Sequence, residues 1–250
     1  MKNKTLLAVL CLLLVAFVSC SKASHENASA DSFADNSNEV VSSKAEDIQE
    51  TYKEVPEEAE PVYVSPLAAE NFLLPLEDYS WEREYVPEYV MLHFTSAVVP
   101  CRDNPYDISR VRKIFEESEI SIHYIVDRDG NVQCYIPESR AAWHAGRGCL
   151  AGDERLTNAM NKYSIGIEIL AIGSKTDMAQ YLTSAEYDDL PTELIGFTDA
   201  QYNTLKTLVK DICKRNSIPF DKAHVIGHNM YNPAKTDPGE LFSWDNLFAE

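Results

Sequence analysis

Three side chains with metal-binding chemistry lie in or directly after apolar segments of the sequence. His93 lies inside the apolar run 89–94, and His228 directly follows the short apolar run 223–227. Asp237 comes nine residues after His228. Two imidazoles and one carboxylate are a ligand set typical of catalytic zinc, because they leave a fourth position for water. Spacing alone is weak evidence, since a single histidine in a strand is more often an ordinary core residue.

The segments around these residues predict strands. Residues 89–94 and 163–172 are apolar and β-prone, which is typical of buried strands. Residues 121–126 and 132–136 flank the Asp-Gly turn signal at 127–131, and this pattern predicts a β-hairpin.

Two helices are predicted between the strands. Asp107 or Ser109 can cap a helix that runs through Ser118. Thr198 can cap a long amphipathic helix that ends near Asn216. The apolar face of this helix contains Leu205, Leu208, Val209 and Ile212. Strands interleaved with helices predict an α/β domain with a mixed central β-sheet flanked by helices.

The remaining segments of the domain are shorter or irregular. A short strand is predicted over 223–227, and a loop rich in Pro and Gly over 228–240. The acidic stretch 173–197 shows no regular pattern and is expected to border a cleft.

Five sequence motifs, taken in order, resemble the zinc-dependent N-acetylmuramoyl-L-alanine amidases. This family includes phage-type amidases, the bacterial anhydro-muramyl amidases and the peptidoglycan recognition proteins. The resemblance extends from about residue 88 to 245 and implies a single domain of this fold within 61–250. The motifs are Val90-Met91-Leu92-His93-Phe94-Thr95, the segment 121–130, Ala142-Trp143-His144-Ala145-Gly146, Tyr163-Ser164-Ile165-Gly166-Ile167-Glu168, and Gly227-His228 with Lys235-Thr236-Asp237-Pro238-Gly239.

The resemblance assigns roles to the residues at the matching positions. It implies that His93, His228 and Asp237 bind Zn²⁺, which polarises the scissile carbonyl and activates water. Glu168 matches the acid that takes the proton of the water and passes it to the leaving amine. Lys235 matches the cation that stabilises the developing negative charge.

The resemblance also implies a substrate cleft and a reaction. Trp143 and His144 match residues of the cleft wall, whereas His123 is expected to have a structural role or to support a ligand. Phage-type members have a tyrosine at the position of Ile122, so Glu168 is the better general base here. The expected activity is hydrolysis of the amide bond between N-acetylmuramic acid and L-Ala in peptidoglycan or muropeptides. A peptidoglycan-binding module without catalysis is the alternative, and the competent third ligand, Asp237, favours the enzyme.

The N-terminus predicts export. Lys2 and Lys4 precede the uncharged apolar run 6–18, which is too short to span a bilayer and is typical of a signal peptide. The run leads to a sequence that resembles a lipobox, in which Cys20 would be lipidated. Cleavage after Ala23 and an uncleaved N-terminal anchor remain as alternatives. All three alternatives export the domain, and lipidation would attach it to the membrane of the bacterial cell envelope.

Residues 21–60 predict a flexible acidic tether, because they are polar and contain few large apolar side chains. In the whole chain, 22 Lys and Arg stand against 40 Asp and Glu, which gives a net charge of −18. This balance excludes nucleic acid as an expected partner, and we expect a monomer. Four cysteines remain in the domain, and this even number is compatible with two disulfides or with free thiols. These are Cys101, Cys134, Cys149 and Cys213.

Overall fold

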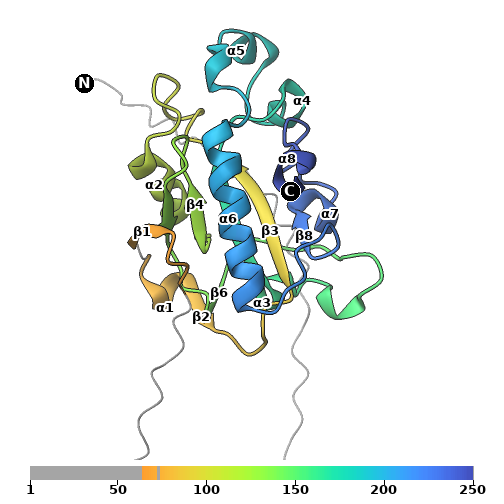
Figure 1. Cartoon of the computed structure of the whole chain (residues 1–250). Helices are drawn as coiled ribbons and strands as arrows, with labels where there is room; N and C mark the ends of the chain where they lie inside the picture. Colours follow the sequence, from red (N-terminus) through yellow and green to blue (C-terminus); the bar gives the residue numbers. More distant parts are fainter. Residues whose placement is uncertain (1–63, 72–73, 250) are drawn as a thin grey trace, which may run out of the picture. The chain divides into compact units, whose positions relative to one another are not determined.

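The computed structural model describes residues 64–71 and 74–249. Its helices and strands are interleaved along the chain, as the sequence predicts (Figure 1). In chain order they are β1 Ala68–Asn71, α1 Leu76–Tyr79, β2 Ser80–Glu82, β3 Tyr89–Thr95, α2 Ile108–Ser118, β4 Tyr124–Val126, β5 Val132–Cys134, β6 Arg140–Ala142, a 3₁₀ turn Glu154–Leu156, α3 Met160–Tyr163, β7 Ser164–Leu170, α4 Lys175–Met178, α5 Ser184–Asp188, a second 3₁₀ turn Thr192–Leu194, α6 Asp199–Arg215, β8 Val225–Gly227, α7 His228–Tyr231 and α8 Trp244–Phe248.

The central sheet has six strands in the order β1-β5-β4-β7-β3-β8. Strands β4, β7, β3 and β8 run parallel to one another, whereas β5 pairs antiparallel with β4 and parallel with β1. A separate antiparallel pair joins β2 to β6. The predicted fold class, a mixed central sheet flanked by helices, is therefore confirmed.

One face of the sheet is covered by α6, which runs alongside β3 in front of the sheet (Figure 1). Alternate residues of β3 and β7, such as Val90 and Ile167, pack there against Leu208 and Ile212 of the helix. The hairpin turn between β4 and β5 also contacts α6, since a Cβ atom on Gly130 would lie 2.7 Å from Thr204 Oγ1. Gly130 has φ +84°, a conformation that glycine adopts without strain.

The opposite face carries the residues that the sequence assigns to chemistry. Side chains alternate between the two faces of a strand. Because Val90 and Leu92 face α6, His93 faces the other side, and the same alternation places Glu168 of β7 on that side. His93 and Glu168 are direct neighbours in the parallel register of β3 and β7.

Most of the predicted elements are confirmed. Asp107 caps α2 by accepting hydrogen bonds from the backbone N–H groups of Ser109 and Arg110. Thr198 caps α6 in a reciprocal arrangement with Gln201. The predicted hairpin, the two long strands and the short strand before His228 are present. β3 extends one residue beyond its prediction, to Thr95, and the other strands are shorter than predicted by two or three residues.

Two segments differ from the prediction. The loop predicted from residue 228 begins with one helical turn, α7, closed by a bond from the Asn232 N–H to the His228 carbonyl. The stretch 173–197 was predicted to be irregular but contains α4 and α5, which begin with capping boxes at Ser174 and Thr183. Helices of four or five residues are too short to show an apolar period, so the caps were their only signal.

The predictions for the N-terminus lie outside the described residues. They include the signal peptide, the tether of residues 21–60 and lipidation of Cys20. Within residues 64–71 and 74–249, none of the helices combines the length and hydrophobicity that crossing a bilayer requires. The four cysteines of the domain are free thiols.

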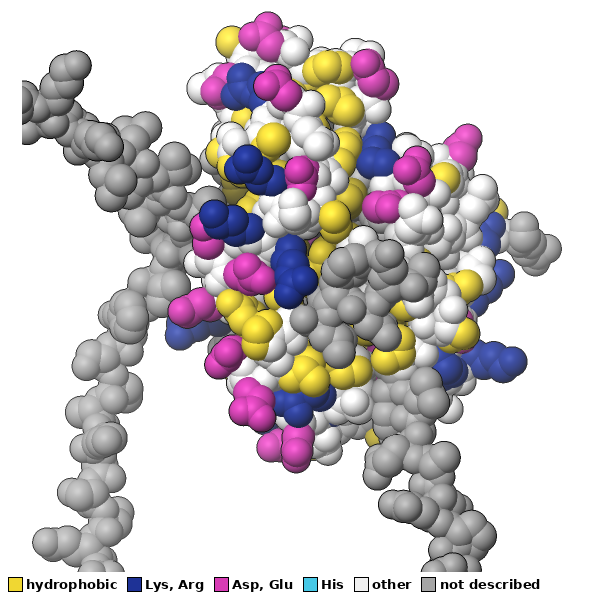
Figure 2. Space-filling model, turned by 90° about the vertical axis from the view of Figure 1, so that its left-hand side faces the viewer, with side chains coloured by type: hydrophobic (Ala, Val, Ile, Leu, Met, Phe, Trp, Pro, Cys, Tyr) yellow, Lys and Arg dark blue, Asp and Glu magenta, His cyan; other side chains and the backbone are white. Residues whose placement is uncertain are grey.

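Basic side chains are interspersed with acidic ones on the surface that carries α1 and α2. Figure 2 shows this face, on which Lys and Arg alternate with Asp and Glu and do not gather in one patch. Several of these charges pair on the surface, such as Lys113 with Glu117 one helical turn later at 3.5 Å.

A buried carboxylate joins the sheet to the C-terminal end of α6. The side chain of Glu138 is 0% exposed and accepts two hydrogen bonds from Arg215, at 2.6 and 2.8 Å. Tyr124 donates a third bond at 2.5 Å, and the Asn216 side chain donates a fourth at 2.8 Å. Because every oxygen of this carboxylate is used, the cluster fixes the position of α6 on the sheet.

We expect Glu138→Ala to destabilise the protein strongly. The free energy of unfolding should fall by about 3 kcal/mol, the lower end of the range for a broken buried ion pair, because Arg215 is 25% exposed. Urea unfolding of the two proteins measures this difference. Glu117→Ala, which breaks the exposed pair with Lys113, is the matched control and should cost less than about 0.5 kcal/mol. A loss at Glu138 as small as that of the control would contradict this interpretation.

Candidate metal centre

The three predicted ligands converge in the structure. His93 comes from β3, His228 is the first residue after β8, and Asp237 lies in the loop that follows α7. Because β3 and β8 are neighbouring parallel strands, both histidines lie at the carboxyl ends of these strands, on the same side of the domain. Asp237 Oδ2 lies 2.7 Å from His93 Nδ1 and 3.0 Å from His228 Nδ1. The two Nδ1 atoms are 3.1 Å apart.

The chemistry of these atoms fits a cation. His228 Nε2 lies 3.0 Å from the carbonyl oxygen of Ala145, which can only accept a hydrogen bond, so Nε2 carries the proton of the neutral ring and Nδ1 carries a lone pair. Burial opposes ionisation of Asp237, but the two imidazoles beside it outweigh burial and lower its pKa below the usual value. A carboxylate and an unprotonated nitrogen therefore meet at contact distance, an arrangement that a metal ion stabilises.

Glu168 adds a second unsatisfied group. Its Oε2 atom is buried and has no hydrogen-bond partner among the described residues. Burial raises the pKa of Glu168 well above its ordinary value, the charge of Asp237 raises it further, and the charge of Lys235 opposes both effects. A buried carboxyl with a raised pKa beside a candidate metal site has the properties of a general base.

Lys235 comes from the loop between two of the candidate ligands. Its backbone N–H donates to the carbonyl of Asn232 at 2.9 Å, which closes the turn after α7. Its charge opposes the rise in the pKa of Glu168, and it adds to the effect of burial, which lowers the pKa of His93. The loop thus brings a cation close to the same space as the three donor atoms.

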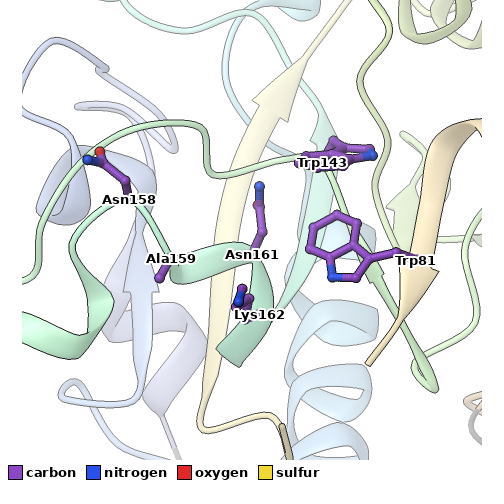
Figure 3. A pocket seen from close by; sticks show the side chains of 6 residues that line it. All are labelled: Trp81, Trp143, Asn158, Ala159, Asn161 and Lys162. Carbon is purple, nitrogen blue, oxygen red and sulfur yellow. The ribbon is translucent and has the colours of Figure 1, made fainter. Parts of the chain in front are cut away.

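Trp143 lines a pocket on this side of the sheet. It is 47% exposed, and its ring lies 4.1 Å from that of Trp81, measured between centroids. The pocket has a volume of about 250 Å³, and Figure 3 shows the two tryptophans beside the α3 region. Its lining residues are Trp81, Trp143, Asn158, Ala159, Asn161 and Lys162.

The two remaining histidines of the motifs have different surroundings. His144 Nδ1 lies 3.0 Å from His93 Nε2, so His144 contacts a candidate ligand directly. His123 is fully buried; its Nδ1 accepts the Gly166 N–H at 3.0 Å, and its Nε2 lies 3.1 Å from the Arg140 carbonyl. Burial, with the nearby Arg83 guanidinium, lowers the pKa of His123 to about 3. His123 therefore lies outside the donor set.

Several residues of the site were missed by sequence reasoning. Trp81 belongs to β2, a strand too short for an alternating pattern, and only its residue type could have suggested a pocket wall. Asp177 is buried in α4, and its Oδ2 accepts the backbone N–H groups of Ser174 and Glu240 at 2.9 and 3.0 Å. It thereby attaches the acidic stretch to the loop that carries Asp237.

A mixed sheet that brings two histidines, an aspartate and a buried glutamate together defines a candidate metal-dependent catalytic domain. A family model described as N-acetylmuramoyl-L-alanine amidase matches residues 83–240, which is more than half of the chain. The chain belongs to this family, as the five motifs indicated.

Two curated relatives are similar over the same region. The chain is 32% identical over 131 residues to 1,6-anhydro-N-acetylmuramyl-L-alanine amidase AmpD of Salmonella typhimurium (strain SL1344), which covers 52% of this chain and 56% of that protein. It is 32% identical over 140 residues to N-acetylmuramoyl-L-alanine amidase AmiD of Escherichia coli (strain K12). This match covers 52% of this chain and 44% of that protein. The matches span about half the length of these relatives.

A solved structure has the same fold. The crystal structure of a selenomethionine derivative of AmpD superposes with a TM-score of 0.52 at 22% identity, over 75% of this chain and 96% of that one. At this identity, the similarity establishes the fold of the domain.

We expect Glu168→Gln to stabilise the metal-free protein at pH 7. Folding raises the pKa of Glu168. At a pH above the pKa that this group has in the unfolded chain, Glu168 therefore destabilises the folded protein. At a pH low enough to protonate it in both states, it has no such effect. Removing this group, which must take up a proton on folding at pH 7, should increase the free energy of unfolding by about 1–2 kcal/mol at pH 7 and leave it nearly unchanged at pH 4.

Thermal unfolding in the presence of a chelator, at both pH values, measures this effect. Glu117→Gln makes the same chemical change at an exposed position and should shift the midpoint little at either pH. Equal midpoints for Glu168→Gln and the original protein at pH 7 would show that the buried carboxyl does not destabilise the folded protein, and would contradict the prediction.

Proposed function

We propose that this protein is a zinc-dependent amidase that hydrolyses the bond between N-acetylmuramic acid and L-Ala in peptidoglycan or its muropeptide fragments. The main observation is the convergence of His93 Nδ1, His228 Nδ1 and Asp237 Oδ2 within 3.1 Å, beside a buried Glu168 with an unsatisfied oxygen. Membership of the amidase family and the names of the two relatives support this choice of substrate.

The three donor residues would hold Zn²⁺, which supplies a Lewis acid that polarises the scissile carbonyl and lowers the pKa of water. Glu168 removes a proton from the attacking water and delivers it to the nitrogen of L-Ala as the C–N bond breaks. The products are a carboxylate on the lactyl group of the muramic acid and a free α-amino group on the peptide. Its buried position and raised pKa suit Glu168 to both transfers.

Lys235 stabilises the negative charge that develops on the carbonyl oxygen during attack. Its charge opposes the rise in the pKa of Glu168, which supports a position near that carboxyl. A preorganised cation in a water-poor site stabilises such charge more than water does.

The glycopeptide would lie along the pocket that Trp81 and Trp143 line. Trp143 offers an exposed aromatic surface, and it precedes His144, which contacts His93. Trp81 extends this surface from β2, just before the region that the family model matches. Aromatic rings with nearby amide groups suit the apolar face and acetamido group of an amino sugar.

The activity would be located in the cell envelope. The signal-like N-terminus supports export, and the sequence around Cys20 supports a lipid anchor that leaves the domain on a flexible tether. Peptidoglycan lies in the same compartment, so enzyme and substrate would meet there.

Digestion of defined muropeptides, followed by mass analysis of the products, tests the proposed activity. The whole chain should release the intact stem peptide, lose activity on chelation and recover it when Zn²⁺ is added. Glu168→Gln should lower kcat by roughly 10²–10⁴-fold, the contribution of a positioned general base. Glu117→Gln should retain the activity of the original chain.

Two results would contradict the proposal. Release that persists without metal would exclude the zinc mechanism. Muropeptide binding without turnover in the zinc-loaded protein would establish the alternative, a recognition module. Comparing substrates with and without the anhydro sugar identifies which form the site prefers.

A further inference from the structure

One short segment contacts both histidines of the donor set. His144 Nδ1 lies 3.0 Å from His93 Nε2, and the carbonyl oxygen of the next residue, Ala145, lies 3.0 Å from His228 Nε2. Each contact is made to the ring nitrogen opposite the Nδ1 atom that faces Asp237. The segment therefore supports both rings from behind.

The donors and acceptors in these contacts can be assigned, starting from Ser164, which contacts His144. The hydroxyl of Ser164 donates to the carbonyl of Met160 at 2.7 Å, and its only hydrogen is used there. The contact of 3.2 Å between Ser164 Oγ and His144 Nε2 therefore needs a proton on the imidazole nitrogen. A neutral imidazole has one N–H, so His144 Nδ1 is an acceptor.

The same reasoning extends to the candidate ligand. Because His144 Nδ1 accepts, His93 Nε2 must donate, and His93 Nδ1 is left with its lone pair towards Asp237. The Ala145 carbonyl has the same consequence for His228. Both imidazoles thus adopt the tautomer that a metal ion at Nδ1 requires.

The segment is itself held in place. The side-chain oxygen of Asn161 accepts the backbone N–H of His144 at 3.1 Å and that of Ala145 at 2.7 Å. Gly166 of β7 leaves room for the imidazole of His144, since a Cβ atom there would lie 2.7 Å from ring atoms Cγ and Nδ1. Two elements on either side of the segment therefore fix the ring and its backbone.

We propose that His144 and Ala145, anchored by Ser164 and Asn161, act as an orienting platform that sets the tautomer and ring position of His93 and His228 for metal binding. This inference rests on the proposed metal centre. It makes His144 a positioning residue, in addition to the cleft-wall role that the family resemblance implies. Hydrogen-bond partners behind a ligating imidazole typically change metal affinity by about 10–100-fold.

The direct test is zinc affinity, measured by competition with a chromophoric chelator, together with the visible spectrum of the Co²⁺-substituted protein. Ser164→Ala removes the acceptor behind His144, and we expect affinity to fall by about 10–100-fold with a changed cobalt spectrum. His144→Leu should do the same. His144→Asn, whose side-chain oxygen can occupy the place of Nδ1, should restore much of the affinity.

Ser121→Ala is the matched control. Ser121 is also fully buried, and its hydroxyl also bonds this segment: it donates to the Tyr79 carbonyl at 2.6 Å and accepts the Trp143 N–H at 2.7 Å. It does not contact the ring of His144, so its loss should reduce the thermal midpoint without changing zinc affinity or the cobalt spectrum. Wild-type affinity and spectrum in both Ser164→Ala and His144→Leu would overturn the platform.

A second measurement separates this inference from the proposed function. In the metal-free whole chain, long-range ¹H–¹⁵N NMR of the ring nitrogens should place the proton on Nε2 of His93, His144 and His228. Protons on Nδ1 of His93 or His144 would overturn the platform whether or not zinc binds. If the original chain bound no zinc, the proposed function would fail, and the NMR result would still decide the tautomers.

Discussion

The close approach of three atoms that all carry lone pairs is the constraint on which the rest of the site depends. A carboxylate oxygen and two imidazole nitrogens lie 2.7–3.1 Å from one another, in surroundings that are largely closed to solvent. Lone pairs at such distances repel unless a proton or a metal ion lies between them. The fold must therefore hold three electron-rich groups close together, an arrangement that a bound cation would stabilise.

The sheet provides most of this restraint. Parallel pairing of β8, β3 and β7 places His228, His93 and Glu168 side by side at one edge. The core under α6 fixes the strands, since alternate side chains of β3 and β7 are buried against that helix. The loop that carries Asp237 is restrained separately, because its backbone bonds Asp177 of α4 and Asn229 of α7.

Much of this arrangement could be predicted from the sequence. The long strands and α6 have strong periodic patterns, and their caps mark where the helices begin. The donor set could be named only from the order of the motifs, because two histidines and an aspartate spaced this way are compatible with many folds. The structure adds that their donor atoms meet.

Other features gave no signal in the sequence. The turn of α7 and the strand β2 are too short to have a period. His144 and His93 are 51 positions apart, and Asn161 lies 16–17 positions after the backbone groups of Ala145 and His144 that it bonds. These contacts therefore depend on how the elements pack. A cleft histidine and one that supports a ligand look the same in a motif.

X-ray absorption at the zinc edge, on the zinc-loaded whole chain, tests the central claim most directly. Coordination by His93, His228 and Asp237 predicts one zinc per chain, with only nitrogen and oxygen ligands at about 2.0–2.1 Å and two of them from imidazole. These features should disappear in His93→Ala. A sulfur ligand at about 2.3 Å, or an unchanged spectrum in that variant, would place the metal elsewhere and contradict the account.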